Sequence, residues 1–482
     1  MRITNQMTTN NMLLNMSRNA AAVDSLYSQL VTGKKIQLPS DNPIIASRAL
    51  KFRTNIFETE QYASNVNQGT SWMEITEQAL SNVSEALDSV KELAQEGTTS
   101  TFNINNKQTF ADQLQAILDR LSGEMNVTYA GRYVFSGYRT DKPPVLTKAN
   151  SGASYDITQS LKSVNLETAT VYTQANTSDV PTVSTVTKFK LPYTGANGTG
   201  TPETFPMQVY DATGNAVGAP VNVTVLANAN TATGGTDSAY SPDPDAAYYI
   251  QDTGELILGK DVAATVTANP KGRVDVSYTK NGLEKGDLNP EIYFDCTDNI
   301  SGKTYTMNGQ NIQYEFGVNT RVAINNLAKD NLTATLYGDL KSLINTVNGV
   351  SLSTRDDLVA KYQGTYSGAE LDEVIDKHMT DEKQYYEGVL HDAFSNMITI
   401  VETHKDQASK EYTQLGSRMN RLELIQNRLA QDKLSYTTLM TNNENVDYFE
   451  ASMNLNAANY VYQMALKAGG GIMQTSLADF IR

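Results

Sequence analysis

The sequence predicts an α+β protein: both chain ends form a long antiparallel helical coiled-coil rod, and the middle forms an inserted β-rich outer domain. Three observations lead to this prediction. Apolar residues recur at helical spacing over residues 1–140 and again after residue 322. The stretch between consists of short β-type runs separated by turn residues. Both ends also carry heptad seams, which are typical of helices that pack against other helices.

The first helix is expected to run from near the start of the sequence to Gly33. Its seam alternates steps of four and three residues, through Met12, Met16, Asn19, Val23, Leu26 and Leu30. The segment GKKIQLPSDNP is then a predicted turn, because Pro39 and Pro43 break helices. Ser40 or Asp41 is expected to cap the next helix, with Pro43 in its first turn.

Two long helices are predicted next. Residues 43–96 form a stretch in which only Gly69 is a weak point, far longer than the mean helix of about 11–12 residues. After the loop GTTSTFNINN, a second helix carries Phe110, Leu114, Ile117 and Leu121 on one face. Two long neighbouring helices with a short loop pack most simply as an antiparallel hairpin.

The pattern changes after YAGRYVFSGYRTDKPP, and residues 141–321 are predicted to form a β-rich variable domain. This region is rich in Thr, Gly, Asn, Val and Pro, and its β-type runs include PVNVTVL, GELILG, GRVDVSY and IQYEFGV. Its topology stays open at this point.

Helical periodicity returns near Ile324. The seam positions of the returning helices, apolar except for Gln426, are Leu336, Leu340, Leu343, Val347, Leu371, Ile375, Tyr386, Val389, Ala393, Met397, Ile400, Leu415, Met419, Leu422, Gln426 and Leu429. The final helix carries Phe449, Met453, Ala457, Tyr460, Met464 and Ala468. Residues 469–471 are three glycines that interrupt its pattern, and an apolar set resumes behind them.

These elements predict three parts. Residues 1–44 and 441–482 form a terminal helical coiled coil, the inner assembly domain; residues 45–140 and 322–440 form a long-helix rod; residues 141–321 form the β-rich domain. Two terminal helices alone bury little apolar surface, whereas ordering costs about 1–2 kcal/mol per residue. The terminal pair is therefore expected to be marginal in a monomer and to order when other subunits cover it.

The predicted assembly interface follows from the two terminal seams. It consists of Met12, Met16, Val23, Leu26, Leu30, Phe449, Met453, Tyr460, Met464, Met473, Leu477 and Phe480. Gly469, Gly470 and Gly471 are predicted to act as a hinge that lets the last helix adjust on docking. The alternative for the glycines is a helix C-cap followed by a fraying tail.

Composition excludes several classes of function. The net charge of -15 repels nucleic acid and anionic membrane surfaces. The start of the chain has no continuous apolar h-region, and no stretch of about 18 apolar residues occurs, so we expect a protein that is cytoplasmic or exported without a cleaved signal peptide. The single cysteine, Cys296, permits neither an intramolecular disulfide nor a thiolate-rich metal site.

No pattern in the sequence indicates catalysis, a cofactor or a metal. His378, His391 and His404 are each 13 residues apart and lack the i, i+4 spacing of a helical zinc site. Asp243 and Asp245 lack the glycine and glutamate that complete a calcium loop. Phosphate-binding glycine motifs and the nucleophile elbow are also missing from the sequence. The sequence therefore predicts a protein that is not an enzyme.

Several motifs at both ends resemble the flagellar hook-associated protein 3 family, the hook-filament junction proteins related to flagellin. These are MRITNQM, TGKKIQLPSDNPIIASRAL, YAGRYVFSGYRTDKPP and NENVDYFEASMNLNAANYVYQMALKAGGGIMQTSLADFI. The resemblance covers roughly the first 145 and last 160 residues. It carries no motif in the middle of the chain.

The resemblance implies a secreted structural protein at the hook-filament junction of the bacterial flagellum. Such proteins leave through the flagellar type III export apparatus and assemble in a ring with copies of themselves. Their implied partners are another hook-associated protein on the hook side, flagellin on the filament side and an export chaperone before secretion. Two alternatives stay open: flagellin itself, and a secreted adhesin or enzyme carried on a helical stalk.

Overall fold

The computed structural model describes residues 5–99, 106–173, 182–228 and 239–480. The chain divides into two compact units. The terminal unit comprises residues 1–68, 315–321 and 421–482, and the central unit comprises residues 69–314 and 322–420. The two longest helices contribute residues to both units. The predicted three-part organisation therefore stays a prediction.

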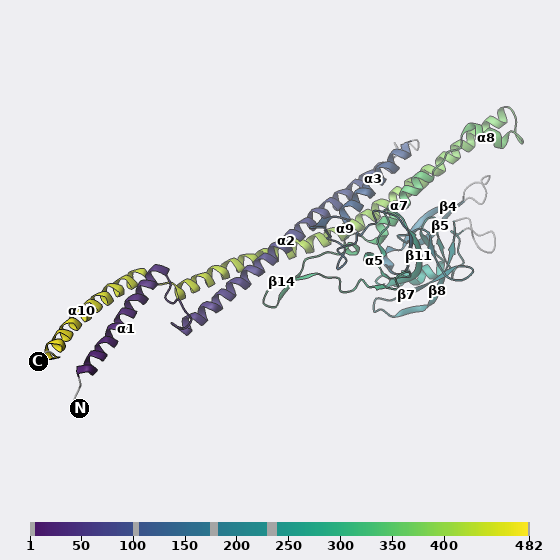
Figure 1. Ribbon diagram of the computed structural model, residues 1–482. Coiled ribbons are helices and arrows are strands. Elements are labelled where there is room, and N and C mark those ends of the chain that lie inside the picture. Colours follow the sequence, from purple (N-terminus) through teal and green to yellow (C-terminus); the bar gives the residue numbers. More distant parts are fainter. Residues whose placement is uncertain (1–4, 100–105, 174–181, 229–238, 481–482) are drawn as a thin grey trace. The chain divides into compact units, whose positions relative to one another are not determined.

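Helices dominate both ends of the chain (Figure 1). The helices are α1 (Asn5–Thr32), α2 (Pro43–Gly97), α3 (Lys107–Met125), the short 3-10 turn η2 (Ser163–Asn165), α4 (Lys260–Thr267), α5 (Pro290–Tyr293), α6 (Ala328–Asn331), α7 (Ala334–Gly349), α8 (Arg355–Tyr362), α9 (Ala369–Glu444) and α10 (Tyr448–Phe480). The predicted α+β class, with helical ends and a central β-rich insert, is confirmed.

The two longest helices, α2 and α9, run antiparallel. In the terminal unit, Lys433 Nζ lies 3.0 Å from Glu60 Oε1. In the central unit, Lys91 Nζ lies 2.8 Å from Glu402 Oε1. Within the central unit Glu77 pairs with Tyr412, and within the terminal unit Arg53 pairs with Glu444, so in each unit the α2 number rises as the α9 number falls. This is the register of an antiparallel coiled-coil pair. The rod predicted from the heptad seams is therefore present.

The insert is built on one large, mostly antiparallel sheet in the central unit. Its strand order is β13-β12-β3-β11-β7-β8-β9-β10-β5-β4, with β6 paired to β11 and with β8 and β9 parallel. The strands of this sheet are β3 (Asn150–Lys162), β4 (Glu167–Thr173), β5 (Thr182–Lys190), β6 (Ala196–Asn197), β7 (Thr204–Tyr210), β8 (Ala216–Leu226), β9 (Ala247–Ile250), β10 (Glu255–Leu258), β11 (Arg273–Leu283), β12 (Asp295–Asp298) and β13 (Thr304–Tyr305).

Two short hairpins flank the sheet in sequence. They are β1 (Thr128–Tyr129) with β2 (Arg132–Tyr133), and β14 (Gln313–Gly317) with β15 (Thr320–Ala323). The first hairpin turns through Ala130 and Gly131, both with positive φ, inside the motif YAGRYVFSG. A turn with two positive φ values matches the right-handed twist of the strands that it joins.

The central unit has a continuous apolar core. In the second half of α2, Leu80, Val83, Leu87, Val90 and Ala94 form a buried face, each at most 1% exposed. The predicted positions of α7, at Leu336, Leu340, Leu343 and Val347, are buried as well. Helix packing against a shared core, rather than helix propensity, stabilises elements of this length.

The prediction that Ser40 or Asp41 caps α2 is wrong. Asn42 caps the helix instead, since its Oδ1 accepts hydrogen bonds from the backbone N–H groups of Ile44 (3.1 Å) and Ile45 (3.2 Å). Asp41 is occupied in the preceding turn, where one carboxylate oxygen accepts the N–H groups of Gln37 and Leu38, each at 2.9 Å. An Asx residue directly before Pro43 leaves the proline at the first helical position, where its missing N–H costs nothing.

Candidate assembly interface

Helices α1 and α10 lie side by side and antiparallel in the terminal unit (Figure 1). The predicted seam of α1, at Met12, Met16, Asn19, Val23, Leu26 and Leu30, is the half-buried side of that helix. Large apolar residues elsewhere on α1 are exposed, for example Leu14 and Tyr27. The α1 seam therefore covers α10 within the same chain.

The predicted seam of α10 does not face α1. Its side chains Phe449, Met453, Tyr460 and Met464 are 81, 59, 61 and 43% exposed. The covered side of α10 carries a different set, which is Ala451, Leu455, Ala458, Tyr462, Ala465 and Gly469. At about 100° per residue the two sets lie on nearly opposite sides of the helix. We call the exposed set Phe449, Met453, Tyr460 and Met464 the outward face of α10.

Four members of the predicted site are not assigned to the covered or the outward side of α10. The backbone of Gly471, Met473, Leu477 and Phe480 belongs to α10. The surroundings of these four residues lie outside the described residues. Their predicted roles at the interface and in the hinge stay predictions.

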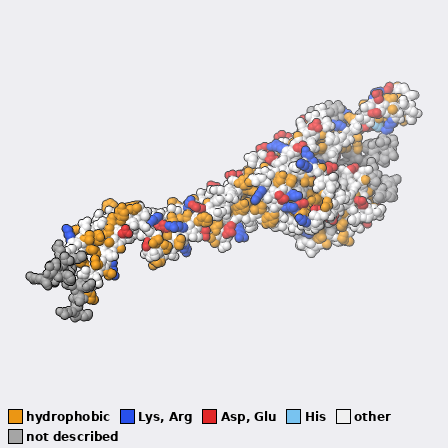
Figure 2. Space-filling model, in the orientation of Figure 1, with side chains coloured by type: hydrophobic (Ala, Val, Ile, Leu, Met, Phe, Trp, Pro, Cys, Tyr) orange, Lys and Arg blue, Asp and Glu red, His pale blue; other side chains and the backbone are white. Residues whose placement is uncertain are grey.

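The terminal unit has very little core of its own. Among its described apolar residues only Ala49, Val66, Phe316, Leu422, Leu429 and Ala451 are buried. Most of the strongly exposed large apolar side chains of the described chain fall in this unit, and Figure 2 shows apolar side chains gathered along the arm that α1 and α10 form. Contiguous exposed apolar surface on this scale is typical of a protein-protein interface.

The glycine triplet does not interrupt α10, which continues through it to Phe480. Gly469 is buried where α1 approaches, because a Cβ there would overlap the terminal methyl of Met12. Gly470 has open space instead, with no atom within 4 Å of a Cβ built on it. The first glycine thus seats a side chain of α1, a role that the sequence pattern did not indicate.

Replacing Gly469, Gly470 and Gly471 together by alanine tests the predicted hinge. Alanine is expected to stiffen the helix by about 1 kcal/mol per site. The end of the flexible Met12 side chain can move away from the new Cβ, so the monomer should fold. Assembly of purified subunits, followed by light scattering and electron microscopy, should be impaired. Gly470→Ala alone is the matched control, and unchanged assembly by the triple variant would remove the hinge role.

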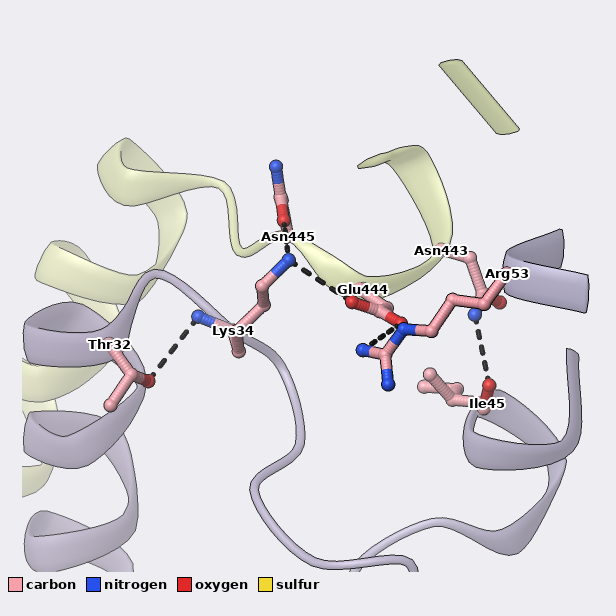
Figure 3. Close-up of polar contacts among 7 residues, drawn as sticks. All are labelled: Thr32, Lys34, Ile45, Arg53, Asn443, Glu444 and Asn445. Carbon is pink, nitrogen blue, oxygen red and sulfur yellow. Dashed lines mark hydrogen bonds and ion pairs between the residues drawn. The ribbon is translucent and has the colours of Figure 1, made fainter. Parts of the chain in front are cut away.

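A polar joint links the connection that follows α1 to the end of α9 and the connection that leads into α10, all within the terminal unit (Figure 3). The backbone N–H of Lys35 donates to the carbonyl of Glu444 (2.7 Å), and the N–H of Val446 donates to the carbonyl of Gly33 (3.0 Å). Lys34 Nζ donates to Glu444 Oε2 (3.1 Å) and to Asn445 Oδ1 (2.7 Å). These bonds hold the two chain ends together although more than 400 residues separate them.

Two further contacts fix the joint to the neighbouring helices. Arg53 of α2 donates to Glu444 Oε1 at 2.7 Å, and the Asn443 side chain donates to the carbonyl of Ile45 at 2.9 Å (Figure 3). Gly33 has a φ of +70°, and a Cβ on it would lie 2.6 Å from the Tyr448 hydroxyl. Only glycine fits this position without strain.

Glu444 is the centre of the joint, since its side chain is 5% exposed and bridges Lys34 and Arg53. Burial alone would raise the pKa of Glu444, but the hydrogen bonds from Lys34 and Arg53 outweigh it and hold the pKa below its usual range. A depressed carboxyl pKa stabilises the fold above the unfolded-state pKa of about 4.3, and this contribution is lost as the pH falls through the folded-state value.

Protonating or neutralising Glu444 is expected to loosen the joint. Glu444→Gln should weaken it at neutral pH by about 1–2 kcal/mol, because both cationic partners are partly exposed. Hydrogen exchange at Lys35 and Val446, corrected for the intrinsic rate, should become about 5–30 times faster. Glu423→Gln, on an exposed position of α9, is the control. Equal protection in the Glu444 variant would show that the backbone bonds alone hold the joint.

The sequence predicted this region as a turn but not the joint itself. Neither the pairing of Glu444 with Lys34 and Arg53 nor the seat of Met12 on Gly469 leaves a periodic signal. The one available cue was the pair of capping residues, Asn42 and Asp447, each directly before a helix; Asp447 Oδ1 accepts the N–H of Phe449 at 2.9 Å.

The described residues contain neither a metal-binding cluster nor a membrane-spanning helix. Over residues 5–99, 106–173, 182–228 and 239–480, no group of three or more His, Cys, Asp or Glu could hold a metal ion. Within the same residues, no helix is both long enough and apolar enough to cross a membrane.

Comparison with known proteins finds relatives of the two helical ends of the chain. Residues 3–140 match the bacterial flagellin N-terminal helical region, and residues 398–480 match the bacterial flagellin C-terminal helical region. The chain thus has flagellin-type helical ends, in the two regions that supply α1, α2, α3, the last part of α9 and all of α10.

Curated relatives define the resemblance more closely. Flagellar hook-associated protein 3 of Salmonella typhimurium is 31% identical over 166 residues, which are 34% of this chain and 52% of that protein. Flagellin of Escherichia coli is 28% identical over 260 residues, which are 52% of this chain and 47% of that protein. The chain is therefore a relative of flagellar hook-associated protein 3, as its motifs predicted, and it spans about half the length of the curated relatives that it matches.

A solved structure shows a distant likeness. The crystal structure of flagellar hook-associated protein 3 from Legionella pneumophila is 12% identical, with a TM-score of 0.33, covering 81% of this chain and 98% of that one.

Proposed function

We propose that this chain is a structural component of the bacterial flagellum, an adaptor that joins the hook side to the flagellin filament and assembles into a ring through its terminal helices. The observation that carries the proposal is the outward face of α10. Its four large side chains are 43 to 81% exposed although the opposite side of the same helix is covered by α1. Covering one such side chain contributes about 1.5–3 kcal/mol, so neighbouring subunits would stabilise the pair.

The proposed partners follow from the same reasoning. Further copies of this chain would cover the outward face laterally, another hook-associated protein would contact the ring on the hook side, and flagellin would contact it on the filament side. An export chaperone would hold the unassembled terminal helices before secretion. The proposed location is outside the cell, at the hook-filament junction, with no role for nucleic acid or a membrane.

Flagellin is the second candidate, because Escherichia coli flagellin matches over 260 residues of this chain. The two functions predict different locations. A junction protein sits at the hook tip in a strain that cannot retain flagellin, whereas a filament subunit is lost to the medium in that strain. Labelling the protein on such cells decides between them, and its absence from hook tips would contradict the proposal.

Deleting residues 473–481 tests the role of the terminal helix. The deletion removes the last part of α10 and is expected to block filament attachment while the β-rich domain still folds. Filament counts by electron microscopy and circular dichroism of the purified chain measure the two effects. Normal filaments on the deletion strain would contradict assembly through this helix. A stalked adhesin or enzyme would instead keep motility and lose function when residues 141–320 are removed.

A further inference from the structure

A cavity of about 270 Å³ lies within the central unit, among the start of β4, strand β5 and helices α7 and α9. Val164, Leu166 and Ile400 supply apolar parts of its wall, and the remaining lining is polar or charged. Exposed side chains such as Thr403 stand at its rim. One water occupies about 30 Å³ in the liquid, so the cavity has room for a small organic molecule.

Four charged side chains from three neighbouring strands share the sheet face beside this cavity. Glu167 is the cross-strand partner of Lys188, and Glu255 is that of Lys190. Lys188 and Lys190 are two residues apart and therefore point to the same face. Lys188 Nζ donates to Glu255 Oε1 at 2.5 Å, and Lys190 Nζ lies 3.7 Å from the same oxygen. Two lysines and two glutamates leave this sheet face without net charge.

Asp339 of α7 adds a negative charge that no described cation neutralises at hydrogen-bond distance. Its side chain is 4% exposed, and Oδ1 is buried without a hydrogen-bond partner among the described residues. His404 Nε2 lies 3.8 Å from Oδ2, too far for a hydrogen bond, and Nδ1 of that ring lies 3.0 Å from Thr333 Oγ1. An unpartnered buried carboxylate oxygen costs free energy unless something donates to it.

Glu167 is the second carboxylate of the cavity without a described donor. It lines the cavity together with Asp339, whereas both lysines have Glu255 as their nearest anion. When all five groups are ionised, the two lysines and three carboxylates leave the cavity with one excess negative charge. This charge is shared by Glu167 and Asp339, whose oxygens still have free acceptor sites. A primary ammonium group has three N–H donors and one positive charge, which matches this surplus.

We propose that this cavity is a binding site for a small organic cation with a primary ammonium group, held by Asp339 and Glu167. The apolar walls at Val164, Leu166 and Ile400 cover the hydrocarbon part of the ligand. An organic cation fits better than a metal ion, because the described residues contain no group of three or more His, Cys, Asp or Glu that could hold a metal. The site is independent of the assembly interface, which lies in the other unit.

Binding at this site is coupled to pH through Glu167. Burial, together with the nearby Asp339, raises the pKa of Glu167 to about 7, although the two lysines oppose this shift. The charged and titratable groups around it are Asp339 from α7, Lys188 and Lys190 from β5, Glu255 from β10 and His404 from α9. Below pH 7 a proton neutralises Glu167, and an ammonium ligand must displace this proton in order to bind. Affinity should rise about tenfold from pH 6 to pH 8.

Calorimetric titration of the full chain with n-butylammonium chloride tests the proposal. Butylammonium should bind at pH 8, about tenfold more weakly at pH 6, while butyrate and butanol should not bind. Asp339→Asn should weaken binding at least tenfold. Asp406→Asn, an exposed carboxylate on α9, is the matched control and should bind as the unchanged chain does.

A second variant keeps the test decisive. If circular dichroism shows that Asp339→Asn does not fold, Glu167→Gln replaces it and should both weaken binding and remove the pH dependence. No binding of butylammonium by the unchanged chain would show that the cavity holds water only and would overturn the proposal. Equal binding by the Asp339 variant, or equal binding of butyrate, would overturn it as well.

Discussion

Two negative charges on the outward face of α10, introduced as Met453→Glu and Tyr460→Glu, are expected to abolish assembly while the isolated chain stays folded. Both side chains are about 60% exposed in the chain, so glutamate there disturbs no existing packing. In an assembled state the same positions would be covered, and each unpaired buried carboxylate would cost several kcal/mol. That cost exceeds what the remaining apolar contacts can offset.

The matched control adds the same charge to the flanks of α10. Ser452→Glu and Asn454→Glu are exposed positions that lie off the outward face, and they should leave assembly unchanged. Swimming motility and filament counts report assembly in cells, and circular dichroism reports the fold of the purified chains. Wild-type motility with the double variant of the outward face would show that this face is not an interface.

The terminal helices show that a heptad pattern predicts the covered side of one helix correctly and that of the other wrongly. The heptad spacing of α1 predicted the side that is half-buried, because that helix has one covering neighbour within the chain. On α10 the same rule selected the larger apolar residues, Phe449, Met453, Tyr460 and Met464. The covered side instead uses Ala451, Ala458, Ala465 and Gly469, together with Leu455 and Tyr462. Close approach of two helices needs small residues, and a hydrophobicity pattern gives these little weight.

In the central unit, the periodic pattern of α9 identified only part of the buried side of that helix. The predicted positions Ile375, Met397 and Leu415 are buried, but the predicted Val389, Ala393 and Ile400 are only partly buried. The prediction missed three fully buried positions, Leu390, Phe394 and Val401. Both sets are apolar because the helix has two neighbours. Phe394 lies against Gly97 and Phe110, and Ala393 and Ile400 line cavities beside the sheet. A single periodic stripe cannot separate two such sides.

The charged cluster around Asp339 could not be predicted from the sequence. Its members come from β4, β5, β10, α7 and α9, and only the pairing of strands with distant helices brings them together. Scattered carboxylates and lysines in the sequence are typical of solvated surfaces. The joint at Glu444 has no local signature in the sequence either, because its partners Lys34 and Arg53 are 410 and 391 residues away. Tertiary ion pairs of this kind have no local signature.

Removing the ring of Phe394 is expected to cause the largest loss of stability in the central unit. The side chain is fully buried, and its ring lies edge to face with Phe110 at 5.9 Å between centroids. It also fills the space opposite Gly97, the last residue of α2, where a Cβ would overlap the ring. One side chain thus connects α2, α3 and α9. Phe394→Ala should cost about 3–5 kcal/mol, since the surrounding helices cannot close the cavity that is left.

Urea unfolding followed by circular dichroism measures this effect, and Tyr412→Ala on the same helix is the matched control. Tyr412 is 40% exposed and loses one hydrogen bond, to Glu77 Oε1 at 3.0 Å, so its removal should cost less than about 1 kcal/mol. Because α10 makes no use of this core, Phe394→Ala lowers assembly only by unfolding the central unit. The outward-face variants should behave in the opposite way, with full stability and no assembly. Loss of stability in the outward-face variants, or loss of assembly by a Phe394→Ala chain that is still folded, would contradict the separation of a self-sufficient core from a terminal unit that is completed by its neighbours.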